Sequence, residues 1–193
     1  DAAQRHGSVF ILDEIVTGFR YALGGAQELY KVTPDLACFG KGMANGLPLA
    51  AVVGRKEIMQ EFEKVFFSTT YGGETLSLAA AKVAICELKA KPVIAHIWAQ
   101  GRKLREGIQK IVTAAGLNVE LVGNPPRSGF VFRDANGQES LAMRSLFLQE
   151  TVKRGVLFGG PVFTTFSHTN KDIAYTLEVV ADAVRILKKA ASE

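Results

Sequence analysis

The stretch PDLACFGKGMANGLPLAAVVGR, residues 34–55, decides the fold because it sets two short apolar runs on either side of a glycine-rich turn. The runs cover Asp35–Phe39 and Leu49–Val53, and a similar run, Ser8–Leu12, lies upstream. Short apolar runs without polar alternation are typical of strands that are covered on both faces, as in an α/β sheet. We therefore predict an α/β fold for this part of the chain.

Glycine-bearing loops lie between these predicted strands, at Gly18–Gly25 and Gly40–Gly46. Loops at one edge of an α/β sheet converge, and ligands bind in the crevice that they form. We expect the chemistry of the protein at that edge. The next segment, Thr75–Lys89, is rich in alanine and predicts a helix, which the flexible pair Gly72 and Gly73 precedes.

Amphipathic helices follow in the second half of the chain. Pro92 is placed to start a long helix with apolar residues at spacings of three and four, and Gly116 is placed to end it. Thr169 and Asp172 resemble a capping box at the start of the last helix. The elements expected between these helices are strands at 118–122, 130–133 and 156–158, and a helix from a Ser140 cap to Arg154.

These patterns place a domain boundary near Lys91. We expect one unit of the α/β class over residues 1–90 and a smaller α+β unit over residues 91–193. Asp1–His6 is typical of a helix end, Gly7 of a residue that terminates a helix, and a strand follows at once. Because a complete chain seldom opens in this way, we expect the sequence to be the C-terminal half of a longer protein.

The composition argues against several classes of protein. With 48% apolar and 22% charged residues, a chain of 193 residues can bury a core. The net charge of +4 is modest and its signs are interspersed, so no nucleic-acid partner is indicated. Two cysteines give neither a disulfide framework nor metal-ligand spacing, and no apolar run approaches the ~20 residues of a membrane span. We expect a cytoplasmic protein without a metal site or a membrane partner.

Two carboxylates, Asp13 and Glu14, stand where the first predicted strand ends. Side chains alternate along a strand, so Asp13 and Ile15 share a face while Glu14 points away from it. An acid beside an apolar surface suits a flat, positively charged heterocycle, because the acid can bond the ring N–H while Ile15 packs on the ring. The residues leave a second interpretation open, in which Asp13 caps a turn or pairs with Arg20.

Lys41 lies between Gly40 and Gly42, directly after a predicted strand. The two glycines let a ligand approach the backbone, and a lysine in a crowded apolar site can lose its proton and form a Schiff base with a carbonyl. A nucleotide phosphate loop is excluded because Asp35 and Gly42 stand where glycine and Ser or Thr are required. The glycine spacing also excludes a dinucleotide fingerprint. A surface lysine in a glycine turn remains the alternative.

Hydroxyl groups and glycines precede the helix predicted from Thr75. The segment STTYGGET, residues 68–75, brings flexible backbone to a helix N-terminus, where free N–H groups and the helix dipole favour an anion. A phosphate group suits such a place. The alternative is ordinary capping of the helix by the Thr75 hydroxyl.

Taken together, three segments resemble the class III aminotransferases in content, order and spacing. They are FILDEIVTGFR at 10–20, PDLACFGKGMANGLPLAAVVGR at 34–55, and TTYGGETLSLAAA at 69–81. The resemblance is closest to members of the glutamate-1-semialdehyde 2,1-aminomutase type. It is specific up to about Ala81, with a weaker echo at Ser167-His168-Thr169 and in the final helix.

The resemblance implies a fold, a cofactor and a site. Residues 1–90 would form the C-terminal part of the large domain of a fold-type I pyridoxal-phosphate-dependent transferase, and residues 91–193 its small α+β domain. The cofactor would be pyridoxal 5'-phosphate, and the reactants a small amino donor and a carbonyl acceptor. In the family pattern Asp13 matches the acid that contacts the pyridinium nitrogen, Ile15 the side chain on the ring, and Lys41 the Schiff-base lysine, which is nucleophile and general base.

The pattern also implies a homodimer, because Thr70 matches the threonine that reaches the phosphate of the neighbouring subunit's cofactor. Three departures leave the substrate open. Gly73-Glu74-Thr75 differs from the usual aminomutase motif, residues 159–166 contain no arginine for a substrate carboxylate, and the family's N-terminal half has no counterpart. An aminotransferase, an intramolecular aminomutase and a non-catalytic fragment all remain compatible with the residues.

Overall fold

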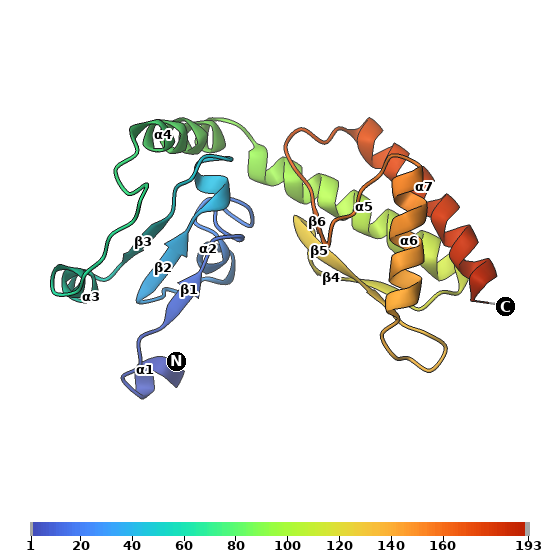
Figure 1. Cartoon of the computed structure of the whole chain (residues 1–193), viewed down its shortest axis with the longest axis horizontal. Helices are drawn as coiled ribbons and strands as arrows, with labels where there is room; N and C mark the ends of the chain where they lie inside the picture. Colours follow the sequence, from blue (N-terminus) through green and yellow to red (C-terminus); the bar gives the residue numbers. More distant parts are fainter. Residues whose placement is uncertain (1, 192–193) are drawn as a thin grey trace. The chain divides into compact units, whose positions relative to one another are not determined.

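The computed structural model describes residues 2–191. The chain forms two compact units that divide between Ile94 and Ala95, and each has a three-stranded sheet of its own. Figure 1 shows the elements of both units. Those of the first unit are α1 (Ala2–Arg5), β1 (Ile11–Asp13), α2 (Ala26–Tyr30), β2 (Leu36–Phe39), the 3-10 helix η1 (Lys41–Met43), β3 (Ala51–Gly54), α3 (Lys56–Met59), the 3-10 helix η2 (Gln60–Glu63) and α4 (Thr75–Ala90).

The sheet of the first unit is mixed. β2 lies between the other two strands, parallel to β1 and antiparallel to β3 (Figure 1). In the register of the parallel pair, Asp13 lies opposite Cys38. The β1 and β2 strands therefore end at the same edge of the sheet, and the loops that follow them leave from that edge.

The first strand differs from its prediction. A strand covered on both faces was expected at Ser8–Leu12, but β1 is shorter and begins at Ile11. Val9 and Ile11 are 52% and 55% exposed. Among the described residues β1 pairs only with β2, so it is an edge strand, and the side chain of Ile11 stands on a sheet face that is not fully covered.

The positions of the other predicted elements in this unit are confirmed within two residues, but β3 is not covered on both faces, since Val53 is 47% exposed. β2 and β3 match the two apolar runs of the opening stretch, and α4 matches the alanine-rich segment. The short helix α1 ends before Gly7, which has the positive φ of a terminating glycine. The buried cluster of this unit is small, because it consists of Met43, Ala44 and Ala81 with a surround of partly buried apolar side chains.

The second unit has an antiparallel sheet and long helices. Its elements are α5 (Val93–Ala115), β4 (Val119–Asn124), β5 (Arg127–Phe132), α6 (Leu141–Lys153), β6 (Pro161–Phe163) and α7 (Asn170–Ala190). The helix caps confirm the sequence predictions, because Ser140 accepts the Met143 N–H at 3.2 Å and Thr169 forms a capping box with Asp172. The strand expected at 156–158 is wrong. These residues form a loop, and the pairing with β5 is made instead by β6.

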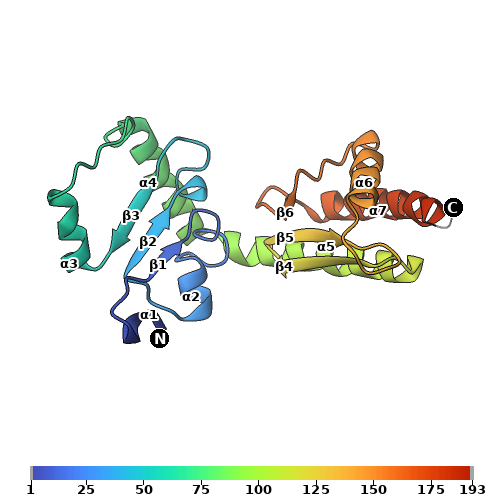
Figure 2. The same cartoon turned by 60° about the horizontal axis from the view of Figure 1, so that its bottom comes forward.

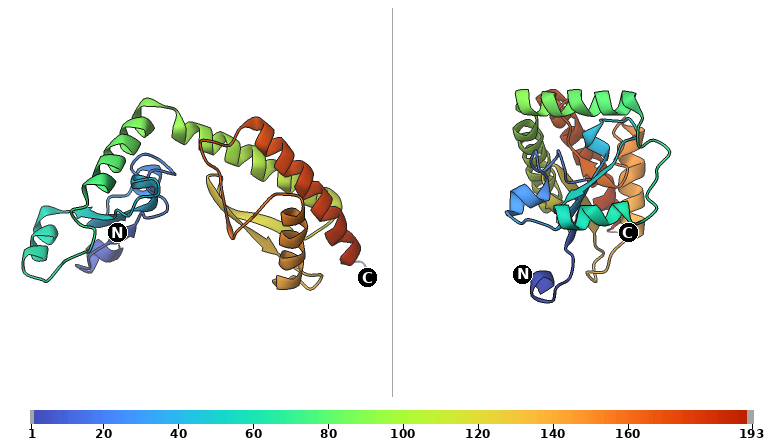
Figure 3. Two further views of the ribbon diagram at one scale, coloured as in Figure 1. Left: turned by 45° about the horizontal axis from the view of Figure 1, so that its top comes forward. Right: turned by 90° about the vertical axis from the view of Figure 1, so that its left-hand side faces the viewer.

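The second unit is a two-layer sandwich of helices and sheet. Figures 2 and 3 show α5 and α7 running beside one another along the β4-β5-β6 sheet. Along β4, Val119 and Leu121 are buried in the core while Glu120 between them is exposed. One face of the sheet therefore carries the core, to which all three helices contribute. None of the described helices is long and apolar enough to cross a membrane.

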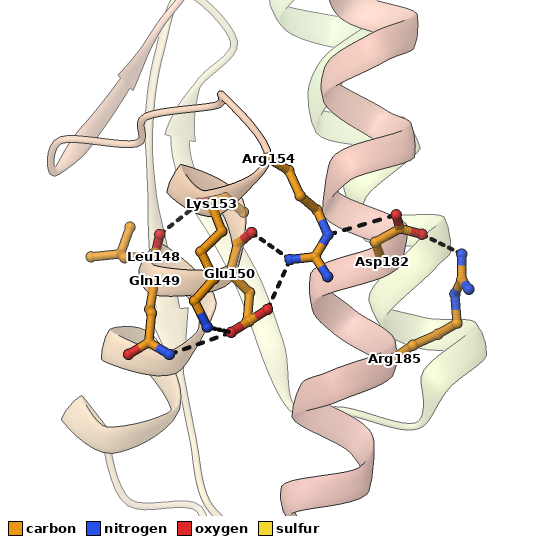
Figure 4. A network of polar contacts seen from close by, with 8 residues as sticks. Leu148, Gln149, Glu150, Lys153, Arg154, Asp182 and Arg185 are labelled. Atoms are coloured by element: carbon orange, nitrogen blue, oxygen red, sulfur yellow. Dashed lines mark hydrogen bonds and ion pairs between the residues drawn. The ribbon is translucent and has the colours of Figure 1, made fainter.

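A buried glutamate joins helices α6 and α7. Glu150 receives Lys153 Nζ at 2.6 Å and Arg154 Nη1 at 2.8 Å, and Arg154 Nε lies 3.7 Å from Asp182 of α7 (Figure 4). Asp182 also pairs with Arg185 one turn on. Lys153 and Arg154 lower the pKa of Glu150 to about 2. The Glu150 carboxylate is thus held charged by two cations at the junction of two helices.

We predict that this pair makes stability depend on pH in the acid range. A carboxyl whose folded pKa is depressed contributes stability above its ordinary value near 4.5, and this contribution is lost as pH falls toward about 2. Glu150→Gln should lower the melting temperature at neutral pH, and the difference from wild type should close as pH falls through that range. Thermal melts of both proteins between pH 7 and pH 3 measure this.

The matched control is Glu178→Gln, which makes the same change at an exposed position of α7. It should leave the melting temperature near that of wild type at every pH. A difference between Glu150→Gln and wild type that stayed constant with pH would contradict the assignment.

Candidate active site

Asp13 is the last residue of β1, and its side chain is exposed. Its Oδ1 accepts the N–H of Ile15 at 2.9 Å, which closes a tight turn at the strand end. The turn interpretation of Asp13 is therefore observed, and it is compatible with a second role for the carboxylate. Among the described residues no hydrogen bond to Oδ2 is found, so the acceptor capacity of this oxygen is available.

Ile15 lies next to the loop that follows β2. A Cβ placed on Gly40 would stand 3.6 Å from Ile15 Cγ2, which is ordinary van der Waals distance. The half-buried Ile15 side chain therefore packs beside the backbone that leads into Lys41. The parallel register places Asp13, Ile15 and Lys41 at the same edge of the sheet, as the sequence predicted for its converging loops.

Lys41 begins the 3-10 helix η1, and its backbone is in the left-handed region with φ of 41°. Residues other than glycine adopt this conformation rarely and at a cost, and such positions concentrate at functional sites. Among the described residues Phe19, Lys31 and Asn45 share it, with φ of 59°, 55° and 48°. Lys31 ends α2, whereas Lys41 and Asn45 lie in the loop after β2 and Phe19 in the loop after β1, so three of the four lie where the candidate residues are.

The two loops are packed against each other. The rings of Phe19 and Phe39 have centroids 5.6 Å apart. A Cβ on Gly42 would lie 3.8 Å from both the Gly18 carbonyl oxygen and Phe19 Cβ. The side chain of Lys41 is exposed on this packed support. The site is therefore a carboxylate, a branched apolar side chain and an amine, carried by two loops in contact.

Glu14 is a residue of this region that sequence reasoning left without a role. Its side chain is fully buried. Oε1 accepts the Gln27 N–H at 2.7 Å, Oε2 accepts the Ala26 N–H at 2.8 Å, and Oε2 also receives the Thr17 hydroxyl. The sequence offered one indication of this role, because the residue before α2 is Gly25, which has no side chain to cap the helix. The first N–H groups of α2 therefore need an acceptor from elsewhere in the chain.

Thr70 lies in an exposed segment ahead of α4, remote in sequence from the other three candidates. The anion site expected at the start of that helix needs correction, and so does the alternative of a Thr75 cap. Glu74 is the cap, and its carboxylate accepts the N–H groups of Leu76 at 2.7 Å and Ser77 at 2.6 Å. Those donors are occupied by a negative charge, so an anion near Thr70 would have to use the threonine hydroxyl and the loop backbone.

Comparisons with known proteins identify the family of this chain. The family model described as "Aminotransferase class-III" matches residues 1–170. A 3-aminobutyryl-CoA aminotransferase of Cloacimonas acidaminovorans is 34% identical over 98% of this chain, and a glutamate-1-semialdehyde 2,1-aminomutase of Syntrophobacter fumaroxidans is 32% identical over 93%. The chain spans about half the length of these relatives, 46% and 45%.

Solved structures show the same fold. The pyridoxal-phosphate internal aldimine form of the FumI protein of Sphingopyxis sp. MTA144 matches the whole chain with a TM-score of 0.91 at 23% identity, over 46% of its own length. A transaminase with pyridoxal phosphate bound matches 99% of the chain with a TM-score of 0.88 at 21% identity, over 47% of its length. By the match of its sequence to the family model over most of its length, this chain belongs to the class III aminotransferase family.

Proposed function

We propose that this chain forms part of a class III aminotransferase that uses pyridoxal 5'-phosphate and acts through Lys41. The observation that carries the proposal is the parallel pairing of β1 with β2, whose register brings Asp13 and the loop of Lys41 to one sheet edge in a chain of this family. The activity is proposed for the whole protein, since the chain spans about half of its relatives.

The residues at this edge suit the cofactor by the chemistry of their groups. A carboxylate with one uncommitted oxygen can bond a protonated pyridine nitrogen, a branched apolar side chain can lie on a flat ring, and an exposed amine can attach to an aldehyde. Gly40 and Gly42 keep side-chain bulk away on both sides of the amine. When bound, pyridoxal phosphate supplies an electron sink for the carbanion formed at the amino donor.

Asp13 is proposed to hold a proton on the pyridine nitrogen. A close ion pair at an effective dielectric of about 20 is worth roughly 4 kcal/mol, which corresponds to about three pKa units. An interaction of that size is enough to fix the protonation state of the nitrogen at neutral pH. Asp13 would serve this role with Oδ2, because Oδ1 is engaged by the Ile15 N–H.

Lys41 is proposed as nucleophile and general base. Its Nζ would take the proton from the α-carbon of the amino donor and return it to another carbon of the reacting system. This transfer requires the amine to stay close to one spot. The packed loops of Phe19 and Phe39 and the left-handed backbone of Lys41 favour such a fixed origin for the side chain.

The same proposal includes a homodimer in which Thr70 reaches the phosphate of the partner's cofactor. Support comes from the segment that carries Thr70, because Phe66 is 98% and Phe67 61% exposed. Leu76 and Leu78 at the start of α4 are exposed as well. Exposed large apolar side chains in one stretch of sequence are compatible with a surface that another chain covers.

The reactants are proposed to be a small amino donor and a carbonyl acceptor, which exchange an amino group. An intramolecular aminomutase is the second candidate, and the similarity to glutamate-1-semialdehyde 2,1-aminomutases favours it. Release of a keto product distinct from the input compound separates the two, because an aminomutase would return only an isomer. We also propose a cytoplasmic location, with which the two free thiols, Cys38 and Cys86, agree.

The first prediction concerns the attachment of the cofactor. When the 193-residue chain is incubated with pyridoxal phosphate and reduced with borohydride, peptide mapping should find the label on Lys41, and Lys41→Ala should remove it. Lys31→Ala is the matched control, because Lys31 is also a left-handed lysine, with φ of 55°, at the end of α2. A label found mainly on Lys31 or Lys56 would overturn the assignment.

The second prediction separates the role of Asp13 from that of Lys41. Asp13→Asn should leave the Lys41 label in place but weaken pyridoxal-phosphate binding more than about tenfold, since a neutral amide lacks the charge that favours a protonated ring nitrogen. Asp134→Asn is the control, because Asp134 Oδ1 accepts the N–H two residues on at 2.9 Å just as Asp13 does. Equal affinities for Asp13→Asn and wild type in a cofactor titration would rule out the role.

The third prediction tests Thr70 and the dimer together. Thr70→Ala should weaken the binding of pyridoxal phosphate but not that of pyridoxal, which lacks the phosphate, and it should leave the dimer intact. Phe66→Ser should shift the chain toward monomer in sedimentation equilibrium, whereas Leu141→Ser, at another exposed position, should not. A wild-type chain that sediments as a monomer at all concentrations would contradict the proposed dimer.

A further inference from the structure

Glu14 lies between the two residues that are proposed to contact the cofactor, and every polar group of Glu14 is engaged. Its backbone N–H donates to the Cys38 carbonyl of β2 at 2.8 Å, and its own carbonyl accepts the Gly18 N–H at 2.8 Å. Its carboxylate accepts the N–H groups of Ala26 and Gln27 and the Thr17 hydroxyl. A single residue thus connects β1, β2, the loop between residues 15 and 25, and the start of α2.

We propose that Glu14 is a positioning residue that sets the orientation of Asp13 and Ile15 relative to the Lys41 loop, an inference that rests on the proposed function. The Glu14 carboxylate is buried at the start of α2, on the N–H groups of Ala26 and Gln27, whereas the Asp13 side chain is exposed. Glu14 acts through the backbone of its two neighbours and through the loop that it closes.

The loop is shaped around the carboxylate. A Cβ on Gly25 would lie 2.2 Å from Glu14 Oε2 and 2.5 Å from Cδ, and Gly25 has a φ of 88°. Glycine is therefore required there both for space and for conformation. A buried carboxylate is tolerated when hydrogen bonds compensate it, and here two of the donors are N–H groups at a helix N-terminus.

The connection continues to the Lys41 loop. Gly18, which bonds the Glu14 carbonyl, is closely packed against Phe39, since a Cβ on Gly18 would meet the ring at 2.6 Å. Phe39 is followed by Gly40 and Lys41. Glu14 therefore fixes both sides of the site: the strand end with Asp13 and Ile15 directly, and the approach to Lys41 through Gly18 and Phe39.

Glu14→Gln tests the proposal with nearly no change of size. An amide nitrogen in place of either carboxylate oxygen would face a backbone N–H, so at least one of the two α2 donors loses its acceptor. Hydrogen exchange at the Ile15 amide, which bonds Asp13 Oδ1, should become about tenfold faster or more. Borohydride trapping of pyridoxal phosphate on Lys41 should slow about fivefold or more relative to trapping on Lys110, an exposed lysine of the second unit.

Asp35→Asn is the matched control for a merely structural role. Asp35 accepts the Phe10 N–H at 2.8 Å and pairs with Arg55 at 3.1 Å, so it joins the opposite ends of the same two strands. The Asp35→Asn variant should have a lower melting temperature. Its rate of hydrogen exchange at the Ile15 amide and its ratio of borohydride trapping on Lys41 to trapping on Lys110 should not change. If Glu14→Gln does not fold, Thr17→Val replaces it, because this change removes one bond to the carboxylate and should shift both readouts in the same direction by less.

The outcomes separate this inference from the proposed function. Unchanged Ile15 exchange and an unchanged Lys41 ratio in a folded Glu14→Gln or Thr17→Val variant would overturn the positioning role, as would equal changes in Asp35→Asn. Failure of the wild-type chain to be labelled at Lys41 would overturn the proposed function. Hydrogen exchange at Ile15 needs no cofactor, and it would still decide whether Glu14 orients the strand end.

Discussion

The parallel pairing of β1 with β2 is the constraint on which the candidate site depends. Parallel strands end at the same sheet edge, and the register of Asp13 opposite Cys38 fixes how far each loop starts from that edge. A shift of one residue would turn Asp13 and Ile15 to the opposite face and bring Glu14 to the site instead. β1 has only three residues, so its own ladder of hydrogen bonds is short. The contacts of the residues that follow it, such as the bond from the Glu14 N–H to the Cys38 carbonyl, therefore help to keep the register.

Glu14 of the first unit and Glu150 of the second are both buried, and their carboxylates are bonded in different ways. Glu14 is surrounded by neutral donors, namely two backbone N–H groups at the start of α2 and a hydroxyl. Glu150 is paired with the cations Lys153 and Arg154 at the junction of α6 and α7. Neutral donors direct a carboxylate through geometry, whereas cations act over longer distances with less directional demand. The first arrangement suits a residue that sets orientation, and the second suits the attachment of one helix to another.

The units also differ in how completely they bury their apolar residues. The second unit has a continuous core in which Ile108, Leu121, Phe147 and Val180 are almost fully buried. In the first unit the buried cluster is Met43, Ala44 and Ala81, while Val9, Ile11 and Val53 are exposed. Exposed apolar residues beside a small core are expected where further protein surface completes a domain. This difference agrees with a chain that spans about half the length of its relatives.

The sequence by itself determined the elements that local chemistry specifies. The alanine-rich α4, the helix from Pro92 to Gly116, the Ser140 cap and the Thr169 and Asp172 capping box were all predicted, because the periodicity or the cap lies within a few residues. These helices and caps need no knowledge of distant partners. The convergence of Asp13, Ile15 and Lys41 at one edge was expected of an α/β sheet, but it depends on the parallel pairing of β1 with β2, which no local pattern specifies.

Tertiary structure alone decided the rest. The exposure of Val9 and Ile11 depends on how the faces of the sheet are covered, and β6 rather than 156–158 is a strand because it is the segment that pairs with β5 across the sheet. Glu74, and not Thr75, is the N-cap of α4, because the backbone conformation decides which of the two adjacent residues precedes the first helical turn. The role of Glu14 depends on N–H groups twelve and thirteen residues away. No local pattern reports such a contact, because its energy arises only when the folded chain brings the carboxylate and its donors together away from water.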